Sequence, residues 1–170
     1  MPSALDLVTG VKAAHQASLG DDHPNTMVAT NNLACYLRCL GRLPEALALT
    51  DDTLTRMQRN LGASHPLTLS CAVNLADCRG DCGDLEEAEA LERQTISLLR
   101  ETLGRDHPDT LVCEANLAVT LRQEGREQDA DELRTRIISD FSRILGAGHP
   151  DAAQLHKWQR INRDLEPQQI

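Results

Sequence analysis

Aromatic residues are nearly absent from this sequence. One Trp, one Tyr and one Phe make up 2% of its 170 residues, although 41% of the residues are hydrophobic. A chain of this length can form one domain with a sizeable core. That core must be filled by Leu, Ala, Ile and Val, and large aromatic platforms for a ligand are scarce.

Long apolar runs are also missing. No stretch of the sequence approaches the roughly 18 apolar residues that a membrane-spanning helix needs. The amino terminus lacks the basic and then apolar order of a secretory signal. The sequence therefore predicts neither a membrane span nor a signal peptide, and the expected location is the cytoplasm.

Runs of basic residues are absent, and acidic residues dominate the composition. The chain has 17 Lys and Arg against 26 Asp and Glu, which gives a formal net charge of -9. Such a surface repels phosphate backbones and anionic lipids. We therefore expect neither nucleic acid nor a membrane as a partner.

Motifs for catalysis are missing as well. The sequence has no Gly-rich phosphate loop, no hydrolase elbow, no paired metalloprotease histidines and no dinucleotide fingerprint. We expect a protein that is not an enzyme and that needs no cofactor and no metal.

What the sequence does contain is an internal repeat. A Leu-Gly step followed by a His-Pro step occurs four times, and each copy begins 42 residues after the previous one. The constant period predicts one helical building block repeated without insertions. The four copies are Leu19-Gly20 to His23-Pro24, Leu61-Gly62 to His65-Pro66, Leu103-Gly104 to His107-Pro108, and Leu145-Gly146 to His149-Pro150.

Each repeat is predicted to hold two helices. A residue before proline is pushed away from helical geometry, whereas proline suits the first helical position, so the His-Pro steps begin the first helices. The four His are interpreted as turn residues that cap these helix starts. Glycines that can adopt a left-handed conformation end the first helices: Gly41, Gly83 and Gly125.

The second helix of each repeat follows at once. It is predicted to begin at Pro44 in the first repeat and at Asp84 in the second, where Glu87 would complete a capping box. One helical hairpin cannot bury both of its faces, so neighbouring repeats must stack. The apolar residues recur at helical spacing: Ala46, Leu49, Leu54, Met57 and Leu61 in the first repeat.

The predicted architecture is one all-α domain over residues 1–170 with about 3.5 repeats. In the last repeat, Gln159 and Arg160 replace Leu33 and Ala34 of the first, and such a polar face would cap the stack. The expected segments are a lone second helix (4–20), three repeats (21–62, 63–104 and 105–146), a capping helix (147–164) and a tail (165–170).

Six cysteines raise the question of zinc. Cys35 and Cys39 are four residues apart, as are Cys78 and Cys82, and this spacing can place two ligands on one helix face. The two pairs sit at repeat positions offset by one residue, so we reject a zinc site. The remaining two occupy equivalent positions and are interpreted as small packing residues: Cys71 and Cys113.

The segments 32–34, 74–76 and 116–118 each read Asn-Leu-Ala and are followed by Gly-Arg or Gly-Asp. They resemble the 42-residue tetratricopeptide repeats of kinesin light chains, and they are equally similar to the carboxyl-terminal repeats of actinobacterial nucleotide-binding (STAND-class) regulators. This resemblance implies a right-handed superhelical solenoid of antiparallel helix pairs. The residues from Arg160 to Pro167 resemble the terminus of those bacterial regulators, which implies that the chain ends a longer signalling protein.

The resemblance also implies a binding groove, because the first helices of such stacks line the concave side. Asn32, Asn74 and Asn116 would then form a ladder along the groove. An amide both donates and accepts, so it can hold a peptide backbone without reading its sequence; alternatively, each Asn bonds to a neighbouring helix. Further candidates would read a partner by charge and shape or, alternatively, are only solvated: Asn31, Cys35, Arg38, Asp77, Asp81 and Arg122.

The only tryptophan, Trp158, takes the ladder position in the fourth repeat. It is either an anchor for a partner or a capping side chain that lies over the third repeat.

The predicted function is therefore a protein–protein interaction module that binds a peptide or protein segment in the concave groove. The alternative is a structural spacer or a self-association domain. A lone second helix at the amino end leaves an apolar flank that a second copy could cover to form a homodimer.

Overall fold

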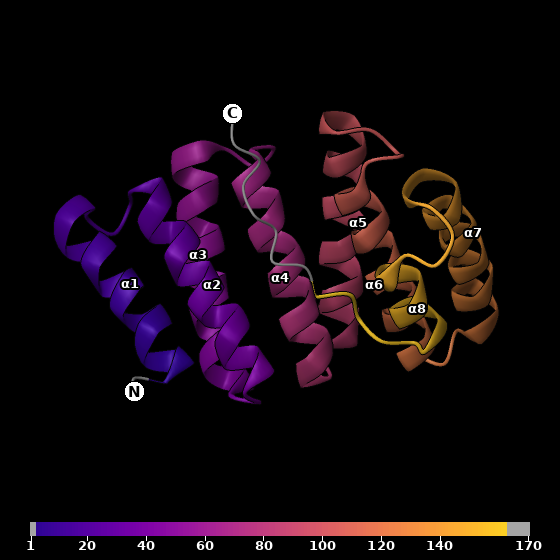
Figure 1. Ribbon diagram of the computed structural model, residues 1–170, viewed down its shortest axis with the longest axis horizontal. Helices are drawn as coiled ribbons and strands as arrows, with labels where there is room; N and C mark the ends of the chain where they lie inside the picture. Colours follow the sequence, from indigo (N-terminus) through magenta and orange to yellow (C-terminus); the bar gives the residue numbers. More distant parts are fainter. Residues whose placement is uncertain (1–2, 163–170) are drawn as a thin grey trace. The chain divides into compact units, whose positions relative to one another are not determined.

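The computed structural model describes residues 3–162, and this part of the chain is entirely helical with short connections (Figure 1). Eight helices and no strand are found within it. The predicted all-α class with alternating first and second helices is confirmed. The helices are α1 (Ala4–Leu19), α2 (Pro24–Cys39), α3 (Leu43–Leu61), α4 (Pro66–Cys82), α5 (Leu85–Thr102), α6 (Pro108–Gln123), α7 (Glu127–Leu145) and α8 (Pro150–His156).

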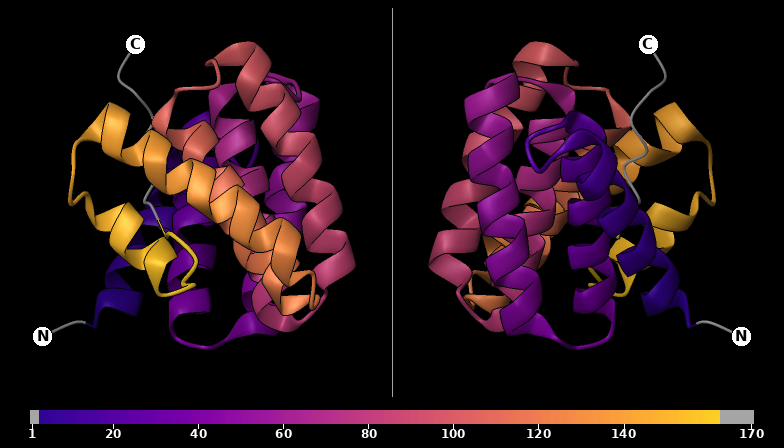
Figure 2. Two further views of the ribbon diagram at one scale, coloured as in Figure 1. Left: turned by 90° about the vertical axis from the view of Figure 1, so that its right-hand side faces the viewer. Right: turned by 90° about the vertical axis from the view of Figure 1, so that its left-hand side faces the viewer.

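The chain divides into two compact units, with the boundary between Cys82 and Gly83. In the N-terminal unit, α2 packs against α1, α3 and α4. In the C-terminal unit, α6 packs against α5, α7 and α8, and α7 also contacts α8, as Figure 2 shows. Each unit is thus built around one first helix that has a second helix on either side. The expectation of a single domain over 1–170 stays a prediction, and residues 165–170 lie outside the described part.

Each first helix begins at a proline, and the preceding histidine caps it. The imidazole Nδ1 accepts a hydrogen bond from the backbone N–H two residues later, which satisfies one of the amides that a helix start leaves without a partner. The predicted capping role is confirmed at all four sites. The bonds run from Asn25 to His23 (3.2 Å), Leu67 to His65 (3.2 Å), Asp109 to His107 (3.2 Å) and Asp151 to His149 (3.3 Å).

The predicted glycine turns are also confirmed. Gly41 and Gly125 have φ values of 74° and 80°, in the left-handed region that glycine adopts without strain. After Gly41, the N–H of Arg42 donates to the carbonyl of Leu37 at 3.0 Å, and the N–H of Gly41 donates to Arg38 at 2.9 Å. This pair of bonds is the Schellman motif that ends a helix.

One predicted cap is wrong. Asp84 is the N-cap residue of α5, but its side chain makes no capping hydrogen bond, so the capping box with Glu87 does not form. Asp84 has a ψ of 63° rather than the extended value of an N-cap whose side chain reaches back over the helix start. A capping box is found instead at Ser3, whose hydroxyl accepts from the N–H of Asp6 at 3.1 Å while the Asp6 carboxylate accepts from the N–H of Ser3 at 2.9 Å.

The second helices supply much of the core, as their apolar spacing predicts. Ala46, Met57 and Leu99 are almost completely buried. In the C-terminal unit, Ile137 and Phe141 of α7 form a cluster with apolar residues of α6 and α8. The interior therefore depends on aliphatic side chains and one phenylalanine.

The last first helix is shorter than expected. The sequence predicts a helix within 147–164, but α8 ends at His156, and residues 159–162 are not helical. Trp158 has a φ of 56°, in the left-handed region that non-glycine residues rarely adopt. The N–H of Gln159 donates to Gln154, and the N–H of Trp158 donates to Leu155, both at 3.0 Å, so a Schellman motif forms here without glycine. We call residues 159–162 the return segment, because this turn redirects them away from the helix axis.

The two equivalent cysteines have the same environment in the two units. Cys71 and Cys113 are both fully buried. The thiol of Cys71 donates to the carbonyl of Thr50 at 3.7 Å, and that of Cys113 donates to the carbonyl of Glu92 at 3.9 Å. Burial raises the pKa of the Cys71 thiol far above its ordinary value. Both cysteines therefore act as small residues in the contact between a first helix and the preceding second helix.

Candidate functional site

The asparagines of the predicted ladder differ in exposure. On α2, Asn32 is exposed and Asn31 is buried. Asn74 of α4 is buried, and Asn116 of α6 is only 1% exposed. Asn32 is thus accessible to a partner, whereas Asn116 already has one within the chain.

Asn116 binds the backbone of the return segment. Its Oδ1 accepts from the N–H of Ile161 at 2.8 Å, and its Nδ2 donates to the carbonyl of Ile161 at 3.2 Å. The N–H and C=O groups of one residue point to the same side only when that residue is extended, as in a β-ladder. The amide therefore pairs with Ile161 as a neighbouring strand would. We call this pair the Asn116 clamp.

The residue before the clamp is held by its side chain. The Arg160 guanidinium donates to Oε1 of Glu92 at 2.9 Å, to Oγ1 of Thr120 at 2.8 Å and to Oε1 of Gln123 at 3.2 Å. The Thr120 hydroxyl itself donates to Glu92 at 2.9 Å. The side chains of Arg160 and Glu92 are only 6% and 1% exposed, so the ion pair is shielded from water. We call Glu92, Thr120 and Gln123 the Arg160 site.

Trp158, the third contact of this region, lies between two arginines. The guanidinium carbon of Arg122 is 4.4 Å from the centre of the indole ring, and that of Arg134 is 4.5 Å away. Both distances fit cation–π contacts. Trp158 is thus half-buried and lies against the third repeat. Three of the predicted site residues therefore belong to this region: Asn116, Arg122 and Trp158.

Three further predicted site residues meet in the N-terminal unit. Arg38 donates to Asp81 at 2.8 Å, and its other terminal nitrogen lies 3.8 Å from Asp77. Burial by itself would lower the pKa of Arg38, but the Asp77 charge and the bond to Asp81 raise it above its ordinary value. Arg38 and Asp77 are buried, so their charges neutralise each other before any partner binds. Cys35, one helical turn before Cys39, is half-buried.

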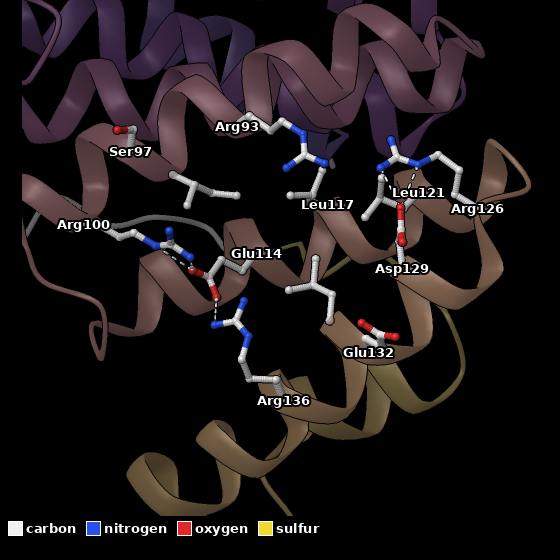
Figure 3. A pocket seen from close by; sticks show the side chains of 12 residues that line it. Arg93, Ser97, Arg100, Glu114, Leu117, Leu121, Arg126, Asp129, Glu132 and Arg136 are labelled. Carbon is white, nitrogen blue, oxygen red and sulfur yellow. Dashed lines mark hydrogen bonds and ion pairs between the residues drawn. The ribbon is translucent and has the colours of Figure 1, made fainter.

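A cavity of about 570 Å³ lies elsewhere, between α5 and α7 with α6 as its floor. Figure 3 shows the side chains that line it. Glu114 lies at its centre and binds Arg100, whose Nε is 2.9 Å away, and Arg136, at 3.1 Å. Two arginines that line the cavity, Arg93 and Arg126, also pair with Glu89 of α5. Partial burial by itself would raise the pKa of Glu89, but hydrogen bonds from these two arginines lower it below its ordinary value.

The same cavity position occurs in the N-terminal unit with different charges. There a cavity of about 130 Å³ lies between α1 and α3, and Thr30 takes the repeat position of Glu114. Gln16 and Asp52 likewise take the positions of Arg100 and Arg136. Arg100, Glu114 and Arg136 are therefore not part of the repeat scaffold. Because Glu114 of α6 pairs with both Arg100 of α5 and Arg136 of α7, the three residues connect these helices electrostatically. One carboxylate balances only one of the two guanidinium charges, so the three residues together keep a net positive charge.

Sequence reasoning missed Glu92, Arg160 and Glu114 as interacting residues. Each is a charged side chain at a position that is small or uncharged in another repeat: Glu92 replaces Thr50, Arg160 replaces Ala118 and Glu114 replaces Ala72. A search for charges at otherwise buried repeat positions could have found them. It could not have paired them, because Glu92 and Arg160 are 68 residues apart.

Metal clusters and membrane spans are absent from the described part of the chain. Within residues 3–162, no group of three or more His, Cys, Asp or Glu lies close enough together to hold a metal ion. In the same range, no helix combines the length and the apolar character that a membrane crossing requires.

Solved structures with the same fold are known. The nearly identical TPR-like repeats of a protein described as a kinesin light chain, from Podosopora anserina, align with a TM-score of 0.73 at 25% identity over 91% of this chain and 74% of that one. A variant of that protein gives 0.74, also at 25% identity, over 91% and 73%. BtubC (BKLC) from P. vanneervenii gives 0.71 at 18% identity over 91% and 64%, which indicates the fold alone. No curated protein matches the sequence significantly.

Family comparison agrees with the structural likeness. The tetratricopeptide repeat family matches residues 29–101 and 73–139, which together span more than half of the chain. Repeats of this family generally mediate protein–protein interaction and are typically not enzymes. On the evidence of its period, its helical hairpins and these matches, the chain belongs to the tetratricopeptide repeat family.

Proposed function

We propose that this protein binds an extended segment of a partner protein along its first helices, with side-chain amides holding the partner's backbone. Asn116 supports this proposal, because its amide pairs with both backbone groups of Ile161. A non-helical segment of the chain is thus bound in the way that a ligand would be. Asn32 and Asn74 occupy the equivalent positions in the preceding repeats.

The charge of the chain favours a protein partner over nucleic acid. With a formal net charge of -9, the protein repels a phosphate backbone. We further propose a cytoplasmic location and a place at the carboxyl end of a larger bacterial signalling protein. The resemblance of residues 160–167 to the end of such regulators supports the latter, and the reading frame that encodes the flanking residues tests it.

The binding proposal is tested by selecting a library of random peptides on the full chain. We expect selected peptides to lose binding when Asn32→Ala, Asn74→Ala and Asn116→Ala are combined. Because Asn74 and Asn116 are buried, circular dichroism must show that this variant folds, and Asn32→Ala alone, at an exposed position, provides an independent test. Asn60→Ala, also exposed but on α3, is the matched control. Peptides that bind both variants as well as the wild type would refute the role of the amides.

Self-association is a second candidate function, and α1 supports it. Leu7 and Val11 are four residues apart on α1 and are 58% and 52% exposed, so they form an apolar strip on one helix face. A second copy could cover this strip. Light scattering across a wide concentration range should then show a dimer that Leu7→Glu dissociates. A strict monomer at the highest concentration would exclude this alternative.

A further inference from the structure

The return segment places an arginine where the other repeats have alanine. Arg160 takes the repeat position of Ala34, Ala76 and Ala118, each of which is almost completely buried. A guanidinium could not fit such a position inside a regular hairpin. The left-handed turn at Trp158 follows the end of α8, so Arg160 lies outside the helix. Its guanidinium pairs with Glu92 of α5 instead.

The Arg160 site needs a cation of a particular shape. Glu92 is a buried carboxylate, and a buried carboxylate without a partner cation is strongly destabilising. Glu92, Thr120 and Gln123 accept from two different nitrogens of one guanidinium. Arginine has such a planar fork of donors, whereas lysine offers a single compact ammonium group. The site therefore distinguishes arginine from lysine as well as from neutral residues.

The next residue is recognised in two ways. Its backbone is held by the Asn116 clamp, which any amino acid could satisfy. Its side chain, Ile161, is 1% exposed and belongs to the core cluster of the C-terminal unit with Leu111 and Leu155. An aliphatic side chain is thus required directly after the arginine.

The residues on both sides of this pair, Gln159 and Asn162, are exposed. The buried side chains of the segment are those of Arg160 and Ile161. A segment from another molecule with the same two residues could make the same buried contacts.

We propose that the Arg160 site and the Asn116 clamp form a binding site for a partner segment with an arginine followed by an aliphatic residue, and that the return segment occupies this site until such a partner displaces it. The proposal rests on the proposed function and specifies its partner. Because the return segment is tethered, its effective concentration at the site is on the order of millimolar. A partner must therefore compete with the chain itself.

The test uses the full chain and a capped peptide, acetyl-Gly-Gln-Arg-Ile-Asn-Gly-amide, which contains no tryptophan. Trp158, the only tryptophan, reports on displacement, because its emission shifts to longer wavelength when it leaves the contact between Arg122 and Arg134. Arg160→Ala opens the site. We expect a labelled form of the peptide to bind this variant at least about ten-fold more tightly than the wild type, a difference of ~1.4 kcal/mol.

Specificity is measured with peptides that carry Lys or Leu in place of Arg. Both should bind the opened chain at least about ten-fold more weakly than the Arg peptide, and adding Glu92→Gln should remove this preference. Glu101→Gln, an exposed glutamate on the same helix, should leave it intact. If Arg160→Ala fails to fold by circular dichroism, Ile161→Ala loosens the return segment while it retains the buried ion pair.

Three outcomes would overturn the proposal. They are equal binding of the Leu and Arg peptides, no binding to a folded, opened chain, and a wild-type dimer that dissociates on Arg160→Ala, which would assign the site to a second copy.

The failure of this inference can be distinguished from the failure of the proposed function. Library peptides that need the three asparagines but show no arginine enrichment would retain the proposed function and refute this inference. An empty library selection together with binding of the Arg peptide would do the reverse.

Discussion

The histidine caps lead to the sharpest prediction about stability. His65→Ala removes the acceptor for the N–H of Leu67, which lies 3.2 Å from Nδ1, and leaves that amide at the start of α4 without its partner. Asn at the same position can cap the helix through its own side-chain oxygen, because Asn is among the preferred N-cap residues. A comparison of the two variants separates the hydrogen bond from the loss of the imidazole ring, which both variants share.

The expected magnitude follows from the geometry of a single neutral hydrogen bond at a helix start. Removal of an N-cap acceptor costs about 1 kcal/mol of unfolding free energy. The four caps lie in separate repeats and share no partner, so their effects should add. Replacing all four histidines by alanine should cost about 4 kcal/mol, a large part of the roughly 5–15 kcal/mol that stabilises a typical domain.

Urea denaturation followed by far-ultraviolet circular dichroism measures the effect, since the described chain is helical throughout. We expect His65→Ala to unfold at lower urea than the wild type and His65→Asn to recover most of the difference. If the asparagine variant were no more stable than the alanine variant, the cap would contribute nothing measurable. The bond to Nδ1 would then be a consequence of the turn and not a cause of it.

Three other predictions follow from individual residues. Phe141 is fully buried in the core of the C-terminal unit, so Phe141→Ala should lower the unfolding free energy by about 3–5 kcal/mol in the same assay; a loss below about 1 kcal/mol would mean that the cavity closes. Burial raises the pKa of Cys78 to about 12, so a disulfide reagent at pH 8 should modify exposed Cys39 rapidly and Cys78 only after unfolding. Cys78→Ser and the wild type should then react at equal rates during the fast phase, and a slower fast phase in Cys78→Ser would contradict the prediction. Because the folded pKa of Glu89 is depressed below 4.5, Glu89 stabilises the fold above that pH and loses this contribution as the pH falls through the folded value. Glu89→Gln should therefore be less stable than the wild type at pH 7 and differ less at pH 3, and a difference that stayed constant with pH would contradict the ion pairs with Arg93 and Arg126.

Features that depend on nearby residues could be predicted from the sequence. The His-Pro helix starts and the turn at Gly41 involve contacts within about one helical turn, so residue type and spacing are sufficient. The sequence pattern places a capping box at Asp84, whereas it is Ser3 that forms one. Both sites have an acceptor residue and an acidic residue three positions later, and the sequence does not show which backbone conformation precedes the helix.

The arrangement at the end of the described chain could not be predicted in the same way. Nothing near Trp158 resembles a helix stop, because no glycine is present there and the strained φ is offset by distant contacts. These contacts are the stacking of Arg122 and Arg134, the Asn116 clamp and the buried pair of Arg160. A single-sequence pattern contains the residues but not their partners, so it predicts that the capping helix continues.

The histidine caps have a consequence for coordination chemistry. A backbone amide can only donate, so each capping ring must carry its proton on Nε2 and leave the lone pair of Nδ1 for the amide. All four rings are thereby fixed as the same tautomer, which the nitrogen shifts of the imidazoles would report directly. The Nδ1 lone pair that a transition metal would need is already in use. A metal could therefore bind these rings only through Nε2, after that nitrogen loses its proton, or by opening the helix start.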